Sequence, residues 1–190
     1  MMKPSFDEVY ELYYDDVWRF HLHAAANVNS ALELTSQTFY RACHAWPRFR
    51  PDAPVKAWLF QIAVNEWRRE LRRRKLTRMI PLSDYFGSGG KDIALDQAEI
   101  RSVSDEIERN ESYLMLHRAL MRLPHKYVTP IMLRFFEHMS ISEVAAILGR
   151  PVGTVKSLIH RGLAKLQEDQ GLREACGESI IEVSQLTVGS

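Results

Sequence analysis

Residues 140–166 read SISEVAAILGRPVGTVKSLIHRGLAKL, and this stretch carries the most specific structural signal in the chain. Ser140 and Glu143 form the S-x-x-E pattern of a capping box, in which each side chain satisfies a backbone donor at the start of a helix. Gly149 can adopt the positive φ that ends a helix, and Pro151 prevents the helix from continuing. The pattern therefore predicts a short helix that begins after Ser140 and ends in a tight turn.

A second helix is predicted to start near Val152 or Gly153. Apolar residues at three- and four-residue spacing give it a core side, and they are Val155, Ile159, Leu163 and Leu166. Small polar and basic residues project elsewhere, and they are Thr154, Lys156, Ser157, His160 and Arg161. Two short helices joined in this way make a helix-turn-helix, whose second helix can enter the major groove of DNA. The five polar and basic residues are therefore the predicted DNA-reading set.

Charge is segregated along the chain, although the formal net charge is only +1. Counting Lys and Arg minus Asp and Glu gives −3 for residues 1–47, +6 for 48–75, −4 for 76–111, +5 for 112–168 and −3 for 169–190. Clustered positive charge is typical of a protein that binds a polyanion, because neutralising phosphates releases condensed counterions. From charge alone, a solvated helix face is the alternative interpretation of each basic block.

The first basic block follows a proline-rich break. Residues 6–75 have a helical pattern of apolar residues that is interrupted at 47–54, where three prolines occur. After the break, residues 56–75 read KAWLFQIAVNEWRRELRRRK and combine an apolar stripe with an increasingly basic face. This predicts one long amphipathic helix. Its basic end also complements the helix dipole at a C-terminus, which is the structural alternative for residues 72–75.

These patterns predict an all-α protein made of two small helical domains that a flexible linker joins. The predicted boundaries are 1–75 for the first domain, 76–111 for the linker, 112–168 for the second domain and 169–190 for a C-terminal tail. The linker is acidic and contains the loop signal GSGG at residues 87–90. That signal lacks the spacing of a phosphate-binding loop, so no nucleotide site is expected there.

The sequence shows no constellation of catalytic or metal-binding residues. Its seven histidines form no HExxH motif or other metal-ligand spacing, and no nucleophilic serine is flanked by glycines. His21 and His23 are the closest pair, and on a helix they would point about 200° apart. The sequence therefore predicts a protein that is not an enzyme and that binds no metal, cofactor or small-molecule substrate.

Cysteine use and hydropathy predict a cytoplasmic protein. Cys43 and Cys176 lie far apart in the sequence without a CxxC pair, which favours buried free thiols over a disulfide or a zinc site. No stretch of about 18 uncharged apolar residues occurs. In addition, Lys3, Asp7 and Glu8 stand where a signal peptide would need an apolar run.

Three motifs occur in order along the chain. LELTSQTFYRACHAW occupies residues 32–46, AWLFQIAVNEWRRELRRRK residues 57–75, and ISEVAAILGRPVGTVKSLIHRGLAKL residues 141–166. The first two resemble the second-region signature of the extracytoplasmic-function sigma factors, which are the smallest class of sigma-70-like proteins. The third resembles the fourth-region signature of the same family. The resemblance covers residues 6–75 and 112–168, and the joint occurrence of the motifs makes it specific.

The resemblance implies a sigma factor that directs RNA polymerase to specific promoters. The implied partners are core RNA polymerase (clamp and flap), promoter DNA and a membrane-anchored anti-sigma factor. Helix 32–46 would dock on the clamp through Glu33, Leu34, Gln37, Thr38 and Arg41. The stretch 48–75 would read and melt the minus-ten element through Lys56, Trp58, Asn65, Arg68, Arg69, Arg72 and Arg73. The helix-turn-helix would read the minus-thirty-five element through its five-residue DNA-reading set.

The chain departs from the usual pattern of the family at residues 32–37, which read LELTSQ where the family usually has more acidic and amide character. This departure bears on the contacts expected with the clamp. Two single residues also depart from the pattern. Arg69 stands where Asp is most frequent, and Leu158 stands where an Arg commonly follows the Lys-Ser pair. The promoter sequence therefore does not transfer from the family. An anti-sigma factor is expected to contact Phe39, Tyr40 or Leu158. The alternative is that Phe39 belongs to the core and Leu158 is an ordinary exposed leucine.

Two further alternatives are open at this point. A regulator without a polymerase partner can bind DNA as a dimer through residues 139–167, but this explains only the second domain. The role of the tryptophans is also open. Separated DNA strands are usually caught by aromatic or loop pockets bordered by positive charge, which Trp58 and Trp67 can supply. Either side chain can equally pack in the core.

Overall fold

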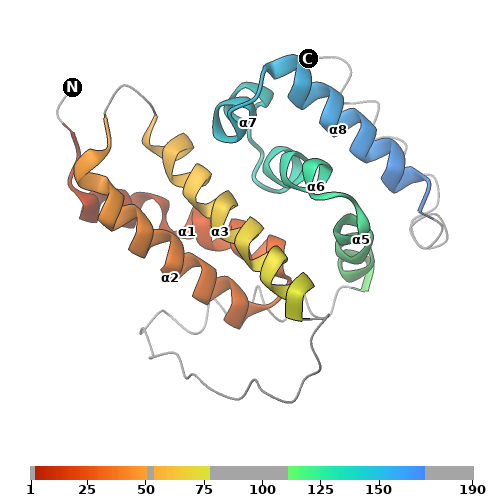
Figure 1. Ribbon diagram of the computed structural model, residues 1–190, viewed down its shortest axis with the longest axis horizontal. Coiled ribbons are helices and arrows are strands. Elements are labelled where there is room, and N and C mark those ends of the chain that lie inside the picture. Colours follow the sequence, from red (N-terminus) through yellow and green to blue (C-terminus); the bar gives the residue numbers. More distant parts are fainter. Residues whose placement is uncertain (1–2, 51–53, 78–110, 170–190) are drawn as a thin grey trace. The chain divides into compact units, whose positions relative to one another are not determined.

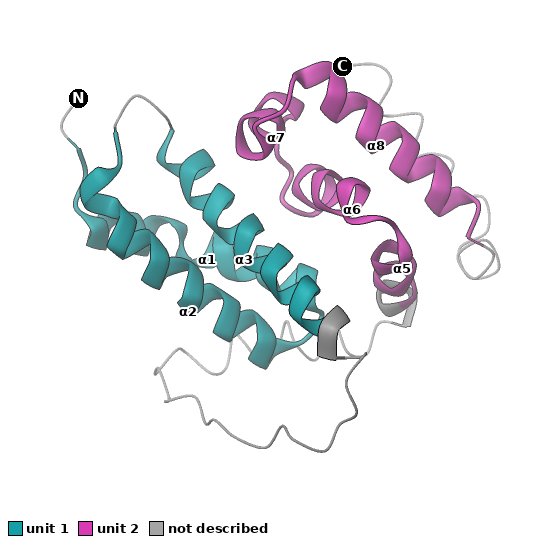
Figure 2. Ribbon diagram, in the orientation of Figure 1, with its two compact units in different colours: residues 1–101 teal, residues 102–190 magenta. Residues whose placement is uncertain are grey.

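The computed structural model describes residues 3–50, 54–77 and 111–169, and every regular element within these ranges is a helix (Figure 1). The chain divides into two compact units, unit 1 (Met1–Arg101) and unit 2 (Ser102–Ser190) (Figure 2). This confirms the predicted all-α class with two helical domains. Apart from the last residues of α3 and the first of α5, the predicted linker lies outside the described residues, as does the tail beyond residue 169.

The described residues of unit 1 form three long helices and one short one. These elements are α1 (Phe6–Ala25), α2 (Val28–Ala45), the 3₁₀ helix η1 (Trp46–Arg48) and α3 (Val55–Thr77). The Ser5 hydroxyl accepts a bond from the Glu8 amide at 3.2 Å, and the Glu8 carboxylate accepts one from the Ser5 amide at 2.8 Å. This capping box fixes the start of α1, because two donors that a helix start leaves unpaired are satisfied.

The polymerase-facing helix predicted from residue 32 begins earlier than that. Asn27 caps α2, and its side-chain oxygen accepts a bond from the Ser30 amide at 2.9 Å. Ala26 closes α1 with a φ of +47°, so the chain reverses within two residues. α2 therefore packs against α1, and α3 packs against both helices (Figure 1).

Large aromatic side chains fill the core of unit 1. Phe20 from α1 meets Phe60 from α3 with ring centroids 5.8 Å apart, and both rings are fully buried. Trp67 is 1% exposed, so the sequence alternative that places it in the core is correct. The core also accommodates two threonines of α2. Thr35 and Thr38 donate their hydroxyl protons to main-chain oxygens one turn earlier, at 2.8 Å each, so their burial leaves no unpaired hydroxyl.

Unit 2 holds the predicted helix-turn-helix. Between residues 111 and 169, the part of this unit that the structure describes, its elements are α5 (Glu111–Arg122), α6 (His125–Ile131), the π-helical turn η3 (Met132–Phe136), α7 (Ile141–Leu148) and α8 (Val152–Gln167). The capping box of Ser140 and Glu143 is present, with bonds of 3.2 and 2.8 Å. Gly149 has a φ of +60°, as the predicted turn requires.

α6 and α8 cross closely at Gly162. A Cβ atom at this position would lie 2.6 Å from Ile131 Cδ1 and 3.0 Å from Tyr127 Cβ, so any residue other than glycine would require these side chains to shift. Val155 and Ile159 pack on the same side of α8 and are buried. The opposite side of α8 is thereby turned to solvent, and this orients the predicted DNA-reading residues.

Candidate nucleic-acid interface

The outward side of α8 carries the five residues that the sequence assigns to the minus-thirty-five element. All five are exposed, and they are Thr154, Lys156, Ser157, His160 and Arg161. Within the described residues of unit 2, the cations of this set form no ion pair. Ser157 donates its hydroxyl proton to the Gly153 carbonyl at 3.0 Å and keeps its oxygen lone pairs available as acceptors. α8 can therefore present both donors and acceptors to a groove.

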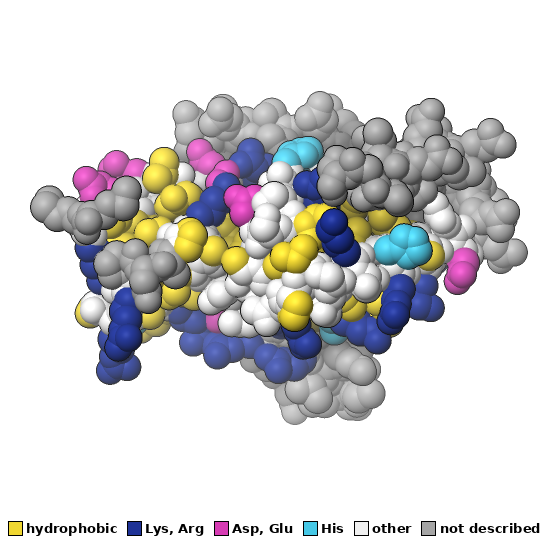
Figure 3. All heavy atoms as spheres, turned by 90° about the horizontal axis from the view of Figure 1, so that it is seen from above, with side chains coloured by type: hydrophobic (Ala, Val, Ile, Leu, Met, Phe, Trp, Pro, Cys, Tyr) yellow, Lys and Arg dark blue, Asp and Glu magenta, His cyan; other side chains and the backbone are white. Residues whose placement is uncertain are grey.

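The outward side of α3 carries a second polar surface. Asn65, Arg69 and Arg72 are exposed, and Lys56 and Arg68 are partly exposed. Gln61 lies one turn before Asn65 on the same side and is also exposed, although the sequence analysis did not single it out. Figure 3 shows Lys and Arg side chains standing at the surface of the described residues beside apolar ones. The outward side of α3 thus changes from amide to guanidinium groups along the helix.

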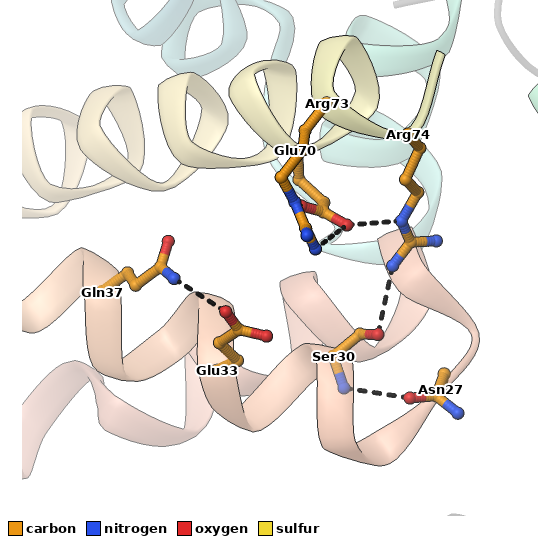
Figure 4. Close-up of polar contacts among 7 residues, drawn as sticks. All are labelled: Asn27, Ser30, Glu33, Gln37, Glu70, Arg73 and Arg74. Carbon is orange, nitrogen blue, oxygen red and sulfur yellow. Dashed lines mark hydrogen bonds and ion pairs between the residues drawn. The ribbon is translucent and has the colours of Figure 1, made fainter. Parts of the chain in front are cut away.

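Several of the α3 cations are held by carboxylates of unit 1. Arg69 lies 3.3 Å from Glu66, and Lys56 lies 2.8 Å from Asp16 of α1. Arg73 and Arg74 both bond to Glu70, at 2.7 and 2.6 Å (Figure 4). These basic side chains therefore already form ion pairs within unit 1. Contact with DNA would have to weaken these ion pairs, or the cations would have to bind phosphate and carboxylate at the same time.

Glu70 and Arg74 together connect α3 to the start of α2. Partial burial alone would raise the pKa of Glu70, but hydrogen bonds from Arg73 and Arg74 outweigh burial and hold that pKa below its usual value. Arg74 extends the chain of contacts by donating to the Ser30 hydroxyl at 3.1 Å (Figure 4). Arg74 therefore contributes to contact between α3 and α2, which is a structural role different from the helix-dipole alternative given for residues 72–75.

Trp58 belongs to an aromatic cluster at the start of α3. Its ring centroid lies 5.6 Å from Trp46 and 4.8 Å from Phe49, and the side chain stays partly exposed. The two readings of Trp58 are therefore compatible: one side of the ring packs inside unit 1 while another part reaches solvent. Trp67 has no such surface.

The residues assigned to polymerase binding divide into two groups. Glu33, Gln37 and Arg41 are exposed on α2, and Gln37 donates to the Glu33 carboxylate at 3.0 Å (Figure 4). Leu34 and Thr38 are 4% and 0% exposed. The prediction that these last two side chains contact polymerase directly does not fit their burial, and they support α2 from the inside.

A buried carboxylate that the sequence analysis missed holds Arg41. Glu66 of α3 is 3% exposed, and it lies 2.7 Å from the Arg41 guanidinium of α2. A charge is rarely buried unless it is paired. The signal for Glu66 was present in the sequence, because it follows Leu59 and Ala63 at helical spacing and thus lies on the apolar stripe.

The residues expected to meet an anti-sigma factor are placed differently from one another. Phe39 is buried, with its ring 4.8 Å from Tyr10 and 5.8 Å from Tyr14, so its core alternative is correct. Burial raises the pKa of Tyr14 to about 12. Tyr40 is 68% exposed, and Leu158 is partly exposed on α8.

The cysteine prediction, the metal-binding residues and the hydrophobic length of the helices can also be compared with the structure. Cys43 is exposed on the side of α2 that carries Ser36 and Tyr40, so the prediction of a buried thiol is wrong for this residue, and Cys176 lies outside the described residues. Among the described residues there is no group of His, Cys, Asp and Glu side chains that could hold a metal ion. No helix in the described part of the chain is long and apolar enough to cross a membrane.

Comparison with known proteins identifies the family. The model of sigma-70 region 2 matches residues 9–77, and the model of sigma-70 region 4 matches residues 113–166. The chain belongs to the sigma-70 family. The two matches together span most of the chain, which a lone helix-turn-helix regulator would not explain. Sigma-70 proteins are non-enzymatic transcription initiation factors.

Curated relatives place the chain within the family. The extracytoplasmic-function RNA polymerase sigma factor SigW of Bacillus subtilis is 26% identical over 166 residues, covering 87% of this chain and 89% of that relative. SigE of Mycolicibacterium smegmatis is 30% identical, covering 87% of this chain and 61% of the relative. The chain is an extracytoplasmic-function sigma factor that directs RNA polymerase to promoters, as the sequence predicted.

A solved structure shares the fold. The sigma factor RpoE in complex with the anti-sigma factor NepR from Bartonella quintana superposes with a TM-score of 0.58 at 23% identity, covering 86% of this chain and 94% of that chain. This likeness supports the helical architecture of the two regions.

Proposed function

We propose that the two units divide promoter recognition between them. Unit 1 binds the polymerase clamp through α2 and opens the minus-ten element with α3, while unit 2 reads the minus-thirty-five element with α8. The observation that carries this assignment is the pair of outward polar surfaces, one on α3 and one on α8, each on a helix whose other side is buried. A factor with two such surfaces can contact two separated stretches of one promoter.

The α8 surface is suited to sequence reading. Its five side chains are exposed on one side of a helix that can enter the major groove. Arg161 is long enough to make the bidentate contact that guanidinium groups make with guanine, and Lys156 can bond a phosphate or a base edge. Because no carboxylate of the described residues holds these cations, contact with DNA costs no internal ion pair.

The α3 surface is suited to binding and opening DNA. Separated strands need positive charge for the backbone and flat surfaces for unstacked bases. The basic side chains of α3 supply the charge, and the partly exposed ring of Trp58 supplies a flat surface beside it. We keep the full predicted set for this surface, which is Lys56, Trp58, Asn65, Arg68, Arg69, Arg72 and Arg73, and we add Gln61.

The polymerase surface of α2 is narrower than the sequence suggested. We assign it to Glu33, Gln37 and Arg41, because these three side chains are exposed whereas Leu34 and Thr38 are not. Arg41 reaches this surface from its ion pair with the buried Glu66, which fixes the position of its guanidinium.

Dependence on polymerase tests the proposal against a stand-alone regulator. Holoenzyme assembled from the purified chain and core RNA polymerase should start transcription at discrete sites on genomic DNA that core polymerase ignores. The free chain should bind the same fragments weakly in a gel shift at physiological salt. Tight and specific binding by the free chain, without any change in where polymerase starts, would favour the regulator.

We further propose that an anti-sigma factor holds this sigma factor inactive in the cytoplasm. The related RpoE was crystallised with an anti-sigma factor, and here apolar side chains on two of the outward surfaces remain open to a partner, namely Tyr40 on α2 and Leu158 on α8. A partner segment that covered Tyr40 would block the polymerase surface of α2, and a segment that covered Leu158 would block the DNA surface of α8. A membrane-anchored protein that co-purifies from the native host and competes with core polymerase would support this mechanism, and a partner that binds together with core polymerase would rule it out.

A further inference from the structure

Lys3 lies ahead of the residues that match sigma-70 region 2, yet it makes specific contacts inside unit 1. Its ammonium donates hydrogen bonds to the main-chain oxygens of Trp46 and Phe49, the latter at 3.2 Å. The same nitrogen lies 4.7 Å from the ring centroid of Trp46 and 5.8 Å from that of Phe49. One partly buried side chain thus bonds the backbone and covers the rings of two residues more than forty positions away.

The start of α1 holds Lys3 in this place. The ring of Pro4 fixes the backbone φ of Pro4 itself, and the capping box of Ser5 and Glu8 fixes the first turn of the helix. Phe6, the first residue of α1, packs on the same Trp46 ring with centroids 5.9 Å apart. Lys3 therefore reaches Trp46 from a fixed main chain, so little backbone freedom is lost when its bonds form.

The contacts of Lys3 hold one end of an aromatic cluster. Trp46 and Phe49 are stacked with ring centroids 4.9 Å apart and planes 6° from parallel, and both rings contact Trp58 of α3. The Trp46 carbonyl that accepts the Lys3 bond also accepts the Phe49 amide at 3.0 Å. The cluster thereby joins the end of α2, the residues after it and the start of α3.

We propose that Lys3 is a positioning residue for promoter opening: it fixes Trp46 and Phe49 and so holds Trp58 in the orientation in which its exposed edge meets an unpaired base. Lys3 acts through the cluster and does not itself touch DNA. The inference rests on the proposed role of α3 in opening the minus-ten element. A role in packing alone would be filled by an apolar side chain on the Trp46 ring, without the cost of desolvating an ammonium group. The ammonium group additionally fixes the orientation of the main chain at Trp46 and Phe49, because it bonds both of their carbonyl oxygens at once.

The substitution Lys3→Met tests this role, because methionine keeps the length and the packing and removes the charge and the donors. In holoenzyme, Lys3→Met should lower the fraction of bound promoter that is open by about tenfold, the effect expected when charge-assisted bonds are lost. Competition for core polymerase should stay within about twofold of the unmodified chain. Hydrogen exchange at the Phe49 amide should become faster, because its acceptor is no longer fixed.

Lys126→Met is the matched control. The Lys126 ammonium lies 5.0 Å from the ring centroid of Tyr127 in unit 2, so this variant removes a similar contact between a cation and a ring at a site outside the cluster. It should leave strand opening and the exchange of Phe49 unchanged.

Three results would overturn the proposal: unchanged exchange at Phe49, faster exchange with normal strand opening, or a loss of polymerase binding as large as the loss of opening. Replacing Arg68, Arg72 and Arg73 together separates this proposal from the assignment of α3. If that triple variant opens promoters normally, the assignment of α3 fails, whereas the exchange result still decides whether Lys3 holds the cluster.

Discussion

The two units place their polar groups in opposite ways. In the described part of unit 1, ionisable and hydroxyl side chains enter the core, and the buried ones are His21, Thr35, Thr38 and Glu66. In the described part of unit 2 the buried polar side chain is Thr129, and the charged groups stand outside. The surfaces differ in the same sense, since arginines of α3 are tied to Glu66 and Glu70 whereas the cations of α8 have no carboxylate partner among the described residues.

This difference shows that a count of charges does not reveal which charged side chains are already paired within the protein. The sequence assigns nearly equal positive charge to the two basic blocks, +6 for residues 48–75 and +5 for 112–168. Part of the positive charge on α3 stabilises unit 1, because its arginines pair with Glu66 and Glu70 of the same helix and Arg74 also bonds to Ser30 of α2. The charge on α8 is available for DNA. Substitutions in α3 should therefore combine effects on stability and on function, and substitutions on the outer side of α8 should affect function alone.

The largest expected effect is acid sensitivity of unit 1 through His21. Burial lowers the pKa of His21 to about 3 in the folded chain, against 6.5 for an unperturbed histidine. The unfolded chain therefore takes up a proton as the pH falls below 6.5 while the folded chain does not. Stability is fully present above pH 6.5 and falls by up to about 1.4 kcal/mol per pH unit as the pH decreases toward 3.

Urea unfolding followed by tryptophan fluorescence measures this effect in unit 1 alone, because all four tryptophans lie there, at residues 18, 46, 58 and 67. His21 bonds to the Thr38 hydroxyl at 2.9 Å. In the variant His21→Gln, the glutamine side chain can keep this bond but does not titrate. The variant should have a smaller decrease in stability between pH 6.5 and 5. Equal slopes in the two chains would show that His21 does not cause the acid sensitivity.

A smaller effect is expected at the helix crossing of unit 2. Gly162→Ala should destabilise unit 2 by about 1–3 kcal/mol, because the new Cβ would overlap Ile131. Gly153→Ala is the matched control, since nothing lies within 4 Å of a Cβ at that position of the same helix. Hydrogen exchange in α6 and α8 should increase for the first variant and not for the second, with tryptophan unfolding of unit 1 as an internal reference. A Gly162→Ala chain with normal exchange would show that the crossing can relax.

The smallest free-energy change is expected at Arg161. Arg161→Ala should weaken promoter binding by holoenzyme on the order of tenfold if the guanidinium contacts a base, and the loss should depend on the base at one position of the minus-thirty-five element. The stability of unit 2 should not change, because Arg161 is exposed and makes no ion pair with a described residue. Binding to a library of promoter variants tests this. A uniform loss across the library would indicate phosphate contact instead.

The sequence predicted those parts of the site where local rules decide the structure. The capping box at Ser140, the positive φ of Gly149 and the outward residues of α8 all follow from patterns within one or two helical turns. The errors arose where packing between helices decides. Thr38 looked like a surface residue, but its hydroxyl bonds within α2 and lets the side chain be buried. Cys43 looked like a core residue, but the side of α2 that it shares with Tyr40 has no covering helix among the described elements.

In the proposed assignment, α3 opens the promoter and α8 reads its minus-thirty-five element. The most direct test is the fraction of polymerase-bound promoter that is open, measured by permanganate reactivity of unpaired thymines. Two triple variants with alanine replacements are compared, one at Arg68, Arg72 and Arg73 and the other at Lys156, His160 and Arg161. The α3 variant should bind core polymerase and yet open a smaller fraction of the bound promoter. The α8 variant should bind less promoter and open the usual fraction of what it binds. Normal opening by the α3 variant, or a loss of opening that is confined to the α8 variant, would contradict the account.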